Sequence, residues 1–419
     1  MPALFDAARD GNVEKARRLL DECQLRQETA NDHMKRRVNE CTKDGTTPLW
    51  IACCFGQTDV VDLLLLHGAD VDATKADGAT PLCIATRKGK LDIVTLLLKH
   101  KANVDKPGKN GDTPLHAASR QGNAAIANVL LCHGADVDTT KESGATPLYI
   151  AAQEGKGSVV DVLLAHKAQV NKSVNDGRTP LYTAAYYNFV DIVVALLMHG
   201  ADANIDCGDN ANPLYCAAIA GKADIVLHLL QHKADPNIAF KADCTPLFAA
   251  SCNGHVDIVK LLLLHGADID LASEKGTTPL YVASDNGKAD VVALLLQHKP
   301  NLNKAREGGT TPLIAASYFG EFDIAQQLVN AGASLLLHDE RGTARDSAIR
   351  QGQSTIAAFL LEACRTQAYG ALSEDRLEDA IELLCQVILC EQSIECTIDL
   401  AQAYLERCYR RRNQKFTSR

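Results

Sequence analysis

Apolar and polar positions along this chain recur with a fixed period of 33 residues over most of its length. Each period holds two apolar stretches separated by polar residues. The second stretch, for example KLDIVTLLLKH at 90–100, has apolar residues at i, i+3, i+4 and i+7, which is typical of a helix with one buried face. The pattern therefore predicts a tandem array of helix pairs, in which each pair buries its apolar faces against its neighbours.

The first helix of each period begins at a Thr-Pro-Leu sequence. The threonine hydroxyl can cap the helix, and proline at the first helical position has no N–H group to leave unpaired. A glycine nine residues after the threonine ends the helix in most periods, as Gly89 and Gly122 do. The copies keep strict register and begin at Thr47, Thr80, Thr113, Thr146, Thr179, Thr245, Thr278 and Thr311, with Asn-Pro-Leu at Asn212.

This unit resembles the ankyrin repeat, a turn–helix–turn–helix unit of the same length. The resemblance covers roughly residues 1–364 and rests on nine in-register copies within 42–337. It implies an all-α fold, an ankyrin-repeat solenoid of helix-turn-helix repeats with hairpin-like loops along one edge, followed by a short C-terminal helical segment.

Both ends of the array depart from the repeat, as terminal units with one face in water are expected to do. At the C-terminal end, Ala-Arg-Asp at 344–346 replaces Thr-Pro-Leu, and its polar residues suit a face with no following neighbour. We predict an N-terminal capping ankyrin-like unit with an insertion at 1–41, nine ankyrin repeats at 42–337, a C-terminal capping repeat at 338–364 and a helical tail at 365–419.

The tail contains two amphipathic segments that resemble pieces of tetratricopeptide repeats without completing one unit. Two interpretations stay open: the segments dock on the last ankyrin unit, or they form a small module for another partner. The apolar face of the first is predicted to include Leu377, Ala380, Ile381, Leu384, Val387 and Ile388, and that of the second Ile394, Ile398, Ala401, Tyr404 and Leu405.

Composition limits the classes of function and the compartment. The net charge of −9 argues against general nucleic-acid binding, and no apolar run approaches the length of a transmembrane helix. The 15 cysteines show no CxxC pair, so we interpret them as reduced thiols and expect a cytoplasmic location, with the nucleus as the alternative. The last residues, 407–419, are basic; a solvated tail is the favoured interpretation, and nuclear import or contact with anionic lipid is the other.

Eight histidines recur at the same period, each directly after a leucine-rich helix. Equivalent atoms of stacked helices lie about 8–10 Å apart, whereas metal ligands lie about 2 Å from their ion. We therefore predict that these histidines meet free carbonyl groups at the helix ends, and we predict no catalytic residue, metal site or cofactor. They are His67, His100, His133, His166, His199, His232, His265 and His298.

Residues that differ between repeats can carry specificity, whereas the shared ones build the fold. The resemblance implies that these variable positions are the hairpin tips and the end of each first helix, which line a concave groove. Adjacent aromatic residues occur there twice, where polar residues are usual, and a small basic run occurs upstream. The predicted partner-binding residues are Phe55, Arg87, Lys88, Arg120, Gln121, Gln153, Glu154, Tyr186, Tyr187, Tyr318 and Phe319.

Alternatives stay open for these residues. The aromatic pairs can pack under a neighbouring loop, and the basic run can be a solvated face.

An aromatic ladder three residues after each threonine is interpreted as filling the seam between repeats, with a binding stripe as the alternative. It comprises Trp50, Tyr149, Tyr182, Tyr215, Phe248 and Tyr281.

Some ankyrin proteins are hydroxylated on a turn asparagine, and two residues resemble that pattern. Asn204 and Asn237 each follow an aspartate by two positions, although neither has the valine of the pattern. They are the candidate hydroxylation sites.

These observations predict a non-catalytic protein-binding scaffold or adaptor, in which a stiff groove binds a partner with little loss of conformational freedom. The alternative is a substrate-receptor subunit of a ubiquitin ligase or similar complex, with the C-terminal helices recruiting a second partner. The expected partners are proteins or peptides of unknown identity, without nucleic acid and without a membrane span.

Overall fold

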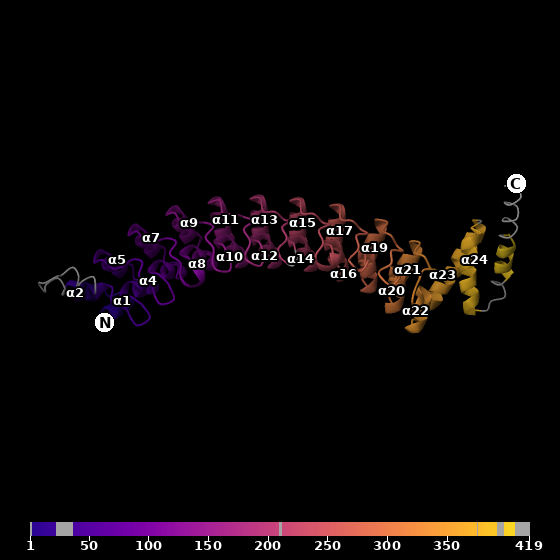
Figure 1. Cartoon of the computed structure of the whole chain (residues 1–419), viewed down its shortest axis with the longest axis horizontal. Coiled ribbons are helices and arrows are strands. Elements are labelled where there is room, and N and C mark those ends of the chain that lie inside the picture. Colours follow the sequence, from indigo (N-terminus) through magenta and orange to yellow (C-terminus); the bar gives the residue numbers. More distant parts are fainter. Residues whose placement is uncertain (1, 22–36, 209–211, 375, 392–397, 407–419) are drawn as a thin grey trace. The chain divides into compact units, whose positions relative to one another are not determined.

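The computed structural model describes residues 2–21, 37–208, 212–374, 376–391 and 398–406. Helices and the turns between them make up nearly all of these residues (Figure 1). They form two compact units. The first comprises Met1–Pro213 with Gln231–Ala234, and the second comprises Leu214–Leu230 with Asp235–Arg419. The predicted all-α array of helix pairs is confirmed within each unit.

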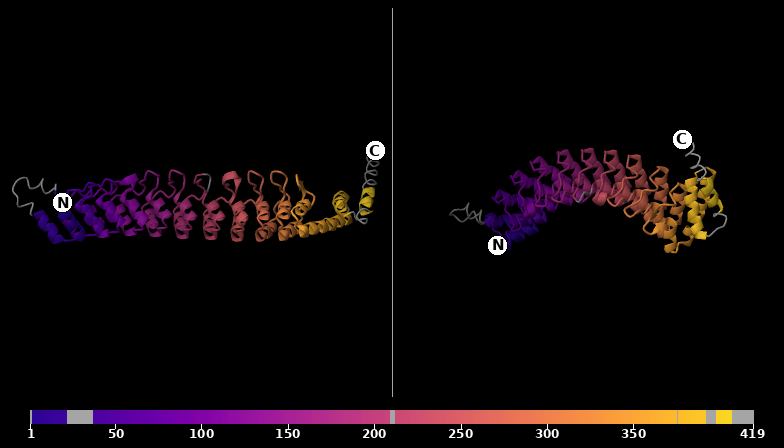
Figure 2. Two further views of the ribbon diagram at one scale, coloured as in Figure 1. Left: turned by 90° about the horizontal axis from the view of Figure 1, so that it is seen from below. Right: turned by 45° about the vertical axis from the view of Figure 1, so that its right-hand side comes forward.

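In the first compact unit, the first helix of each repeat packs on the first helix of the next repeat, and second helices pack on second helices. Loops between the pairs project to one side of the unit (Figure 2, left). In order, the helices are α1 (Pro2–Asp10), α2 (Val13–Asp21), α4 (Pro48–Phe55), α5 (Thr58–Leu66), α6 (Pro81–Arg87), α7 (Leu91–Lys99), α8 (Pro114–Gln121), α9 (Ala124–Cys132), α10 (Pro147–Gln153), α11 (Gly157–Ala165), α12 (Pro180–Tyr186) and α13 (Val190–Met198), with a short 3₁₀ turn at Lys109–Gly111.

The second compact unit continues the same arrangement and ends in longer helices. A short antiparallel hairpin of β1 (His338–Asp339) and β2 (Gly342–Thr343) precedes its last repeat. The helices are α14 (Pro213–Ile219), α15 (Ala223–Gln231), α16 (Pro246–Asn253), α17 (Val256–Leu264), α18 (Pro279–Asp285), α19 (Ala289–Gln297), α20 (Pro312–Phe319), α21 (Phe322–Asn330), α22 (Ala344–Arg350), α23 (Ser354–Ser373) and α24 (Leu377–Glu391); residues 398–406 are also helical, and a 3₁₀ turn covers Lys241–Asp243.

The helix starts form as the Thr-Pro-Leu pattern predicts. Thr80 has an extended backbone, and its Oγ1 accepts a hydrogen bond from the backbone N–H of Cys83 at 3.1 Å, so the side chain satisfies one of the unpaired donors of α6. The helix ends also follow prediction, since Gly122 closes α8 with a φ of 81°. Leucines from both helices of each pair, such as Leu115 and Leu130, are fully buried between the two layers.

A ladder of polar turn residues joins successive loops. The Asp72 carboxylate accepts from the backbone N–H of Asn103 at 3.0 Å, and Asp105 accepts from that of Asp136 at 3.1 Å. In each case the donor lies 31 residues further along the chain. Asparagine takes the same place at Asn237, whose Oδ1 accepts from the backbone N–H of Asp268 at 2.8 Å. These bonds fix the position of each loop against the next one.

The repeated histidines fall into two alternating classes. Nδ1 of His67 lies 2.8 Å from the Leu63 carbonyl oxygen, and because a carbonyl accepts, Nδ1 donates. The predicted bond to the helix end is thus confirmed at His67, and it recurs at His133, His199 and His265. Each of these four precedes a glycine, whereas the other four precede Lys101, Lys167, Lys233 and Lys299, which all have positive φ.

The two ends of the predicted array are described in part. The predicted N-terminal insertion lies largely at 22–36, outside the described residues. The boundary predicted between 364 and 365 falls inside α23, which runs on because no proline or capping residue interrupts it.

No helix of the described residues is both long enough and apolar enough to cross a membrane.

The apolar face predicted for the second tail helix is wrong. Ile398, Tyr404 and Leu405 are exposed, and the helix instead packs Ala403 and Leu400 against the cluster around Leu377. Helical spacing allows either face to be buried, and the contact with Leu377 and Ile381 of α24 decides which face it is. For the first tail helix the prediction holds, since its buried residues include Leu377, Ala380, Ile381, Leu384 and Val387; Ile394 lies outside the described residues.

Candidate functional site

A hollow of about 370 Å³ opens on the loop side of the first compact unit. Three successive repeats supply its walls, because the first helices stack and bring the ends of α8 and α10 next to the loops that follow them. Six side chains give it its chemical character: Arg120, Lys141, Tyr149, Gln153, Val174 and Arg178.

The floor of the hollow is apolar and the rim is charged. Tyr149 and Ile150 of α10 are buried against Ala145 and Val174, which belong to the loops on either side. Apolar contact between consecutive loops keeps this floor in place. A ligand that enters the hollow therefore meets an apolar base, and its polar groups face the side chains above it.

Asp112 lies beside the hollow and is shared by three cations. Its carboxylate oxygens are 3.4 Å from Arg120, 3.2 Å from Lys141 and 3.9 Å from Arg87. Burial alone would raise the pKa of Asp112, but the hydrogen bonds and charges of Arg120 and Lys141 outweigh burial and hold this pKa below its usual value. Asp112 is therefore ionised, and it neutralises one of three positive charges.

A second ion pair sits on the opposite rim. Nε and Nη2 of Arg178 donate to one oxygen of Asp176 at 2.9 and 2.6 Å, which lowers the pKa of Asp176. The remaining N–H groups of this guanidinium are available to another acceptor, because a guanidinium carries five donors.

Four aromatic rings form a connected cluster at the end of α12, one repeat beyond the hollow. Tyr182 stacks on Tyr186 with ring centroids 6.3 Å apart, Tyr186 meets Tyr187 edge-on at 5.2 Å, and Tyr187 lies 6.2 Å from Phe189. Tyr186 and Tyr187 remain 60% and 47% exposed. Asn188 takes a left-handed φ of 67°, which ends the helix where most repeats use glycine.

The second aromatic pair lies in the second compact unit and is partly covered. Tyr318 and Phe319 pack edge-on at 5.0 Å, and the Arg341 guanidinium lies 5.1 Å from the Tyr318 ring. The loop that carries Arg341 thus covers Tyr318 in part, whereas Phe319 stays 52% exposed. Phe55, in the first compact unit, is exposed to a similar degree at 54%.

The aromatic ladder lies in the seams between repeats. At two seams a cation 25 positions later meets the ladder residue: Lys75 lies 4.4 Å from the Trp50 ring and Arg306 lies 5.5 Å from that of Tyr281. Tyr149 meets Val174 at the same spacing. These contacts support the interpretation that Trp50, Tyr149 and Tyr281 fill seams between repeats, while Tyr149 also lines the hollow.

A family model described as ankyrin repeats (3 copies) matches the chain at residues 1–75, 65–141, 135–207, 200–273 and 264–339. The chain belongs to the ankyrin-repeat family. Ankyrin repeats are typically non-catalytic modules that bind other proteins. No curated protein matches the chain.

The ankyrin repeats bring some of the sequence-predicted residues together and leave others apart. Arg120 and Gln153 line the hollow, and Arg87 approaches it through Asp112. The residues that directly follow Arg87, Arg120 and Gln153 in the sequence have exposed side chains; they are Lys88, Gln121 and Glu154.

Sequence reasoning missed the loop half of the hollow, above all Lys141 and Arg178. One signal was available. In most repeats the residue directly before the Thr-Pro-Leu sequence is small or is itself a threonine. Asp112 and Arg178 are the charged exceptions.

The two asparagines predicted as hydroxylation sites belong to the loop ladder. Nδ2 of Asn204 donates to the Lys233 carbonyl oxygen and Nδ2 of Asn237 to that of Gly266, each at 3.2 Å. Both amides therefore hold one loop against the next.

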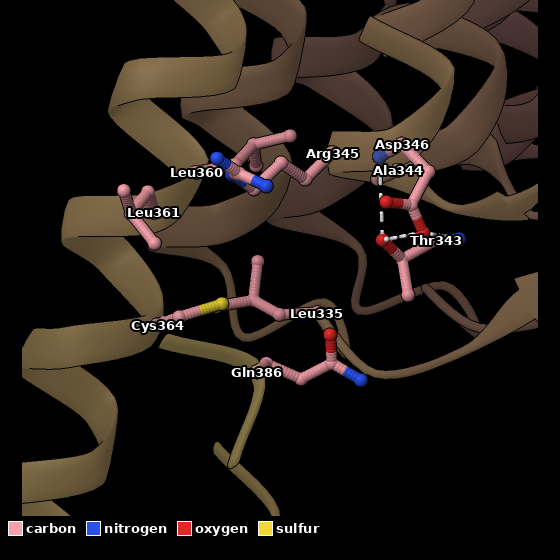
Figure 3. A pocket seen from close by; sticks show the side chains of 9 residues that line it. All are labelled: Leu335, Thr343, Ala344, Arg345, Asp346, Leu360, Leu361, Cys364 and Gln386. Carbon is pink, nitrogen blue, oxygen red and sulfur yellow. Dashed lines mark hydrogen bonds between the residues drawn. The ribbon is translucent and has the colours of Figure 1, made fainter. Parts of the chain in front are cut away.

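A second hollow, between α22, α23 and α24, is too small to be a ligand site. Its volume is about 20 Å³, which is room for one water molecule. Figure 3 shows the side chains that line it. Along its edge, Asp346 accepts from the backbone N–H and the hydroxyl of Thr343 at 2.8 and 2.9 Å, so this aspartate caps α22. Among the described residues, no group of three or more His, Cys, Asp or Glu side chains is placed to hold a metal ion.

Proposed function

We propose that this protein is a non-catalytic scaffold or adaptor that binds a partner protein on the loop side of its ankyrin repeats. The observation that carries the proposal is the exposure of Tyr186 and Tyr187 beside the hollow. Large aromatic side chains anchor protein interfaces because they bury much surface with few rotatable bonds.

The aromatic side chains at the end of α12 are held in place by the fold. Thr179 caps α12 through the backbone N–H of Tyr182 at 3.1 Å, and the stacked rings hold Tyr186 in place before any partner arrives. Binding then costs little conformational entropy. Phe55 and Phe319 would act as further contacts, each within its own compact unit.

A comparative pull-down from native lysate, followed by mass spectrometry, tests the proposal. The test variants change Tyr186 and Tyr187, or Tyr318 and Phe319, to serine; a matched control changes three exposed apolar residues of second helices to serine, namely Leu66, Met198 and Leu264. Circular dichroism verifies that each variant is folded. We expect partners that are lost with the test variants and retained with the control. Equal loss with the control, or no loss at all, would exclude the loop side as the binding surface.

A second candidate function is a substrate receptor, for example of a ubiquitin ligase, whose C-terminal helices recruit another protein. The exposed Ile398, Tyr404 and Leu405 favour it, because they form an apolar surface on the last described helix. The test is truncation after Ser373, at the end of α23, since cutting near 365 would divide that helix. The hypothesis requires one set of partners to be lost while those of the loop side remain.

Three further proposals concern location, lipid contact and modification. We propose a cytoplasmic location, with the nucleus as the alternative. The support is the 15 cysteines, which lack zinc-like spacing and are interpreted as reduced thiols. Contact of anionic lipid with the basic segment 407–419, which lies outside the described residues, is tested by liposome sedimentation with and without it. Hydroxylation of Asn204 or Asn237 requires peptides that carry one added oxygen at these sites.

A further inference from the structure

We propose that the hollow between α8, α10 and their loops binds the carboxylate of an acidic residue in an extended peptide, and that an apolar residue about three positions away in the same peptide packs on Tyr186 and Tyr187. This inference rests on the proposed function and names the chemistry of the partner.

The charges around the hollow are unbalanced in favour of the cations. Arg87, Arg120 and Lys141 share the single carboxylate of Asp112, and on the other rim Arg178 already pairs with Asp176. The shared carboxylate leaves a local excess of two positive charges, in a chain whose net charge is −9. A carboxylate is therefore attracted to this place.

The cations are also placed to donate strong hydrogen bonds. Arg120 donates to Asp112 from Nη1 and Nη2, both at 3.4 Å, and because a guanidinium carries five N–H donors, others remain for a second acceptor. Only 19% of the Lys141 side chain is exposed, which reduces the screening of its charge by water. Arg120 and Lys141 both line the hollow and already contact one and the same carboxylate, that of Asp112, so a peptide carboxylate in the hollow can also meet both.

The spacing within the peptide follows from the stacking of the repeats. The hollow lies at the end of α10, and Tyr186 and Tyr187 lie at the end of α12, the next first helix. Stacked helices are about 8–10 Å apart, and an extended chain advances about 3.3 Å per residue. The acidic residue and the apolar residue are therefore separated by about three positions.

The first experiment is a selection of random dodecapeptides displayed on phage against the immobilised full-length protein. The affinity of each selected peptide is then measured by fluorescence polarisation. The protein variants are Arg120→Gln with Lys141→Gln, and Tyr186→Ser with Tyr187→Ser. The matched control is Lys101→Gln with Lys167→Gln, which removes the same charge from exposed sites at the ends of second helices. Thermal unfolding verifies that all variants are folded.

We expect the selected peptides to share Asp or Glu about three positions from an apolar residue. Binding should weaken about tenfold or more with Arg120→Gln and Lys141→Gln, and should stay unchanged in the control. A double-mutant cycle stays informative even if the protein variant is partly destabilised. In it, the acidic residue of the peptide is changed to its amide. This change should weaken binding to the wild type and have little effect on binding to the Arg120→Gln, Lys141→Gln variant.

Other outcomes overturn the inference in distinguishable ways. Peptides without an acidic residue that still require Tyr186 and Tyr187 would remove the carboxylate site and keep the proposed function. Peptides that are insensitive to every variant, or a library that yields no binder, would count against both. Binding that appears only when phosphoserine replaces the acidic residue would assign the hollow to phosphate in place of carboxylate.

Discussion

The imidazole of His116 connects two neighbouring repeats. Its Nε2 lies 3.0 Å from the carbonyl oxygen of Ala145, while its Nδ1 accepts from the backbone N–H of Thr113 at 3.2 Å. Because the Ala145 oxygen can only accept, Nε2 carries the proton and the neutral ring satisfies both partners. Burial lowers the pKa of His116 from 6.5 to about 4, so the ring stays neutral in the folded protein near neutral pH.

We predict that replacing His116 removes a pH-dependent part of the stability. The unfolded chain binds a proton below about pH 6.5, whereas the folded chain resists it until about pH 4. The contribution is therefore complete above the unfolded pKa and is lost as the pH falls from about 6.5 to about 4, by about 3 kcal/mol in total. Urea unfolding at about pH 7 and about pH 4.5 measures the loss.

The matched variant for this test is His116→Tyr, since Tyr149 occupies the same position in the next repeat. Asp112, Arg120 and Lys141 surround the histidine and are present in both proteins, so their own titration largely cancels in the comparison. Equal pH dependence in the wild type and the variant would mean that folding does not change the pKa of His116.

A second prediction concerns the residue after each repeated histidine, where lysine and glycine alternate. Lys167 has a φ of 64°, which a side chain with a Cβ adopts at a cost, whereas Gly134 has a φ of 87° with open space around it. We expect Lys167→Gly to raise the free energy of unfolding by about 0.5–1 kcal/mol and Gly134→Lys to lower it by a similar amount.

Combining the two substitutions provides the internal control for this prediction. The two sites lie in different repeats, so the effects should add and nearly cancel in the double variant. Denaturant unfolding measures all three proteins. A decrease in stability for Lys167→Gly would show that the lysine charge at the helix C-terminus outweighs the backbone strain.

The parts of this structure that could be predicted from the sequence are those that depend on neighbouring residues. Thr80 caps its helix through a residue three positions later, and His67 bonds the carbonyl four positions earlier, so the repeat itself contains both partners. The hollow depends on residues from three repeats. Lys141 reaches Asp112 across 29 positions, and the variable residues of one helix end do not reveal which loop residue will face them.

The tail shows the same limit. The apolar spacing of the last helix allowed two faces, and only the surface of α24 decides that Ala403 packs while Leu405 stays exposed. Local patterns therefore predicted where helices form, and contacts between distant segments decided which of their faces are used.

The third prediction concerns the loop ladder at Asn237. Its Oδ1 accepts from the backbone N–H of Asp268 at 2.8 Å, and its Nδ2 donates to the Gly266 carbonyl oxygen at 3.2 Å. Asn237→Ala removes both bonds, so we expect the free energy of unfolding to fall by about 1–2 kcal/mol. Asn237→Asp keeps the acceptor, as Asp72 does in an earlier repeat, and should therefore cost less than the alanine variant. Urea unfolding of the three proteins gives the order, and an aspartate variant as unstable as the alanine variant would show that the amide donor, not the acceptor, holds the two loops together.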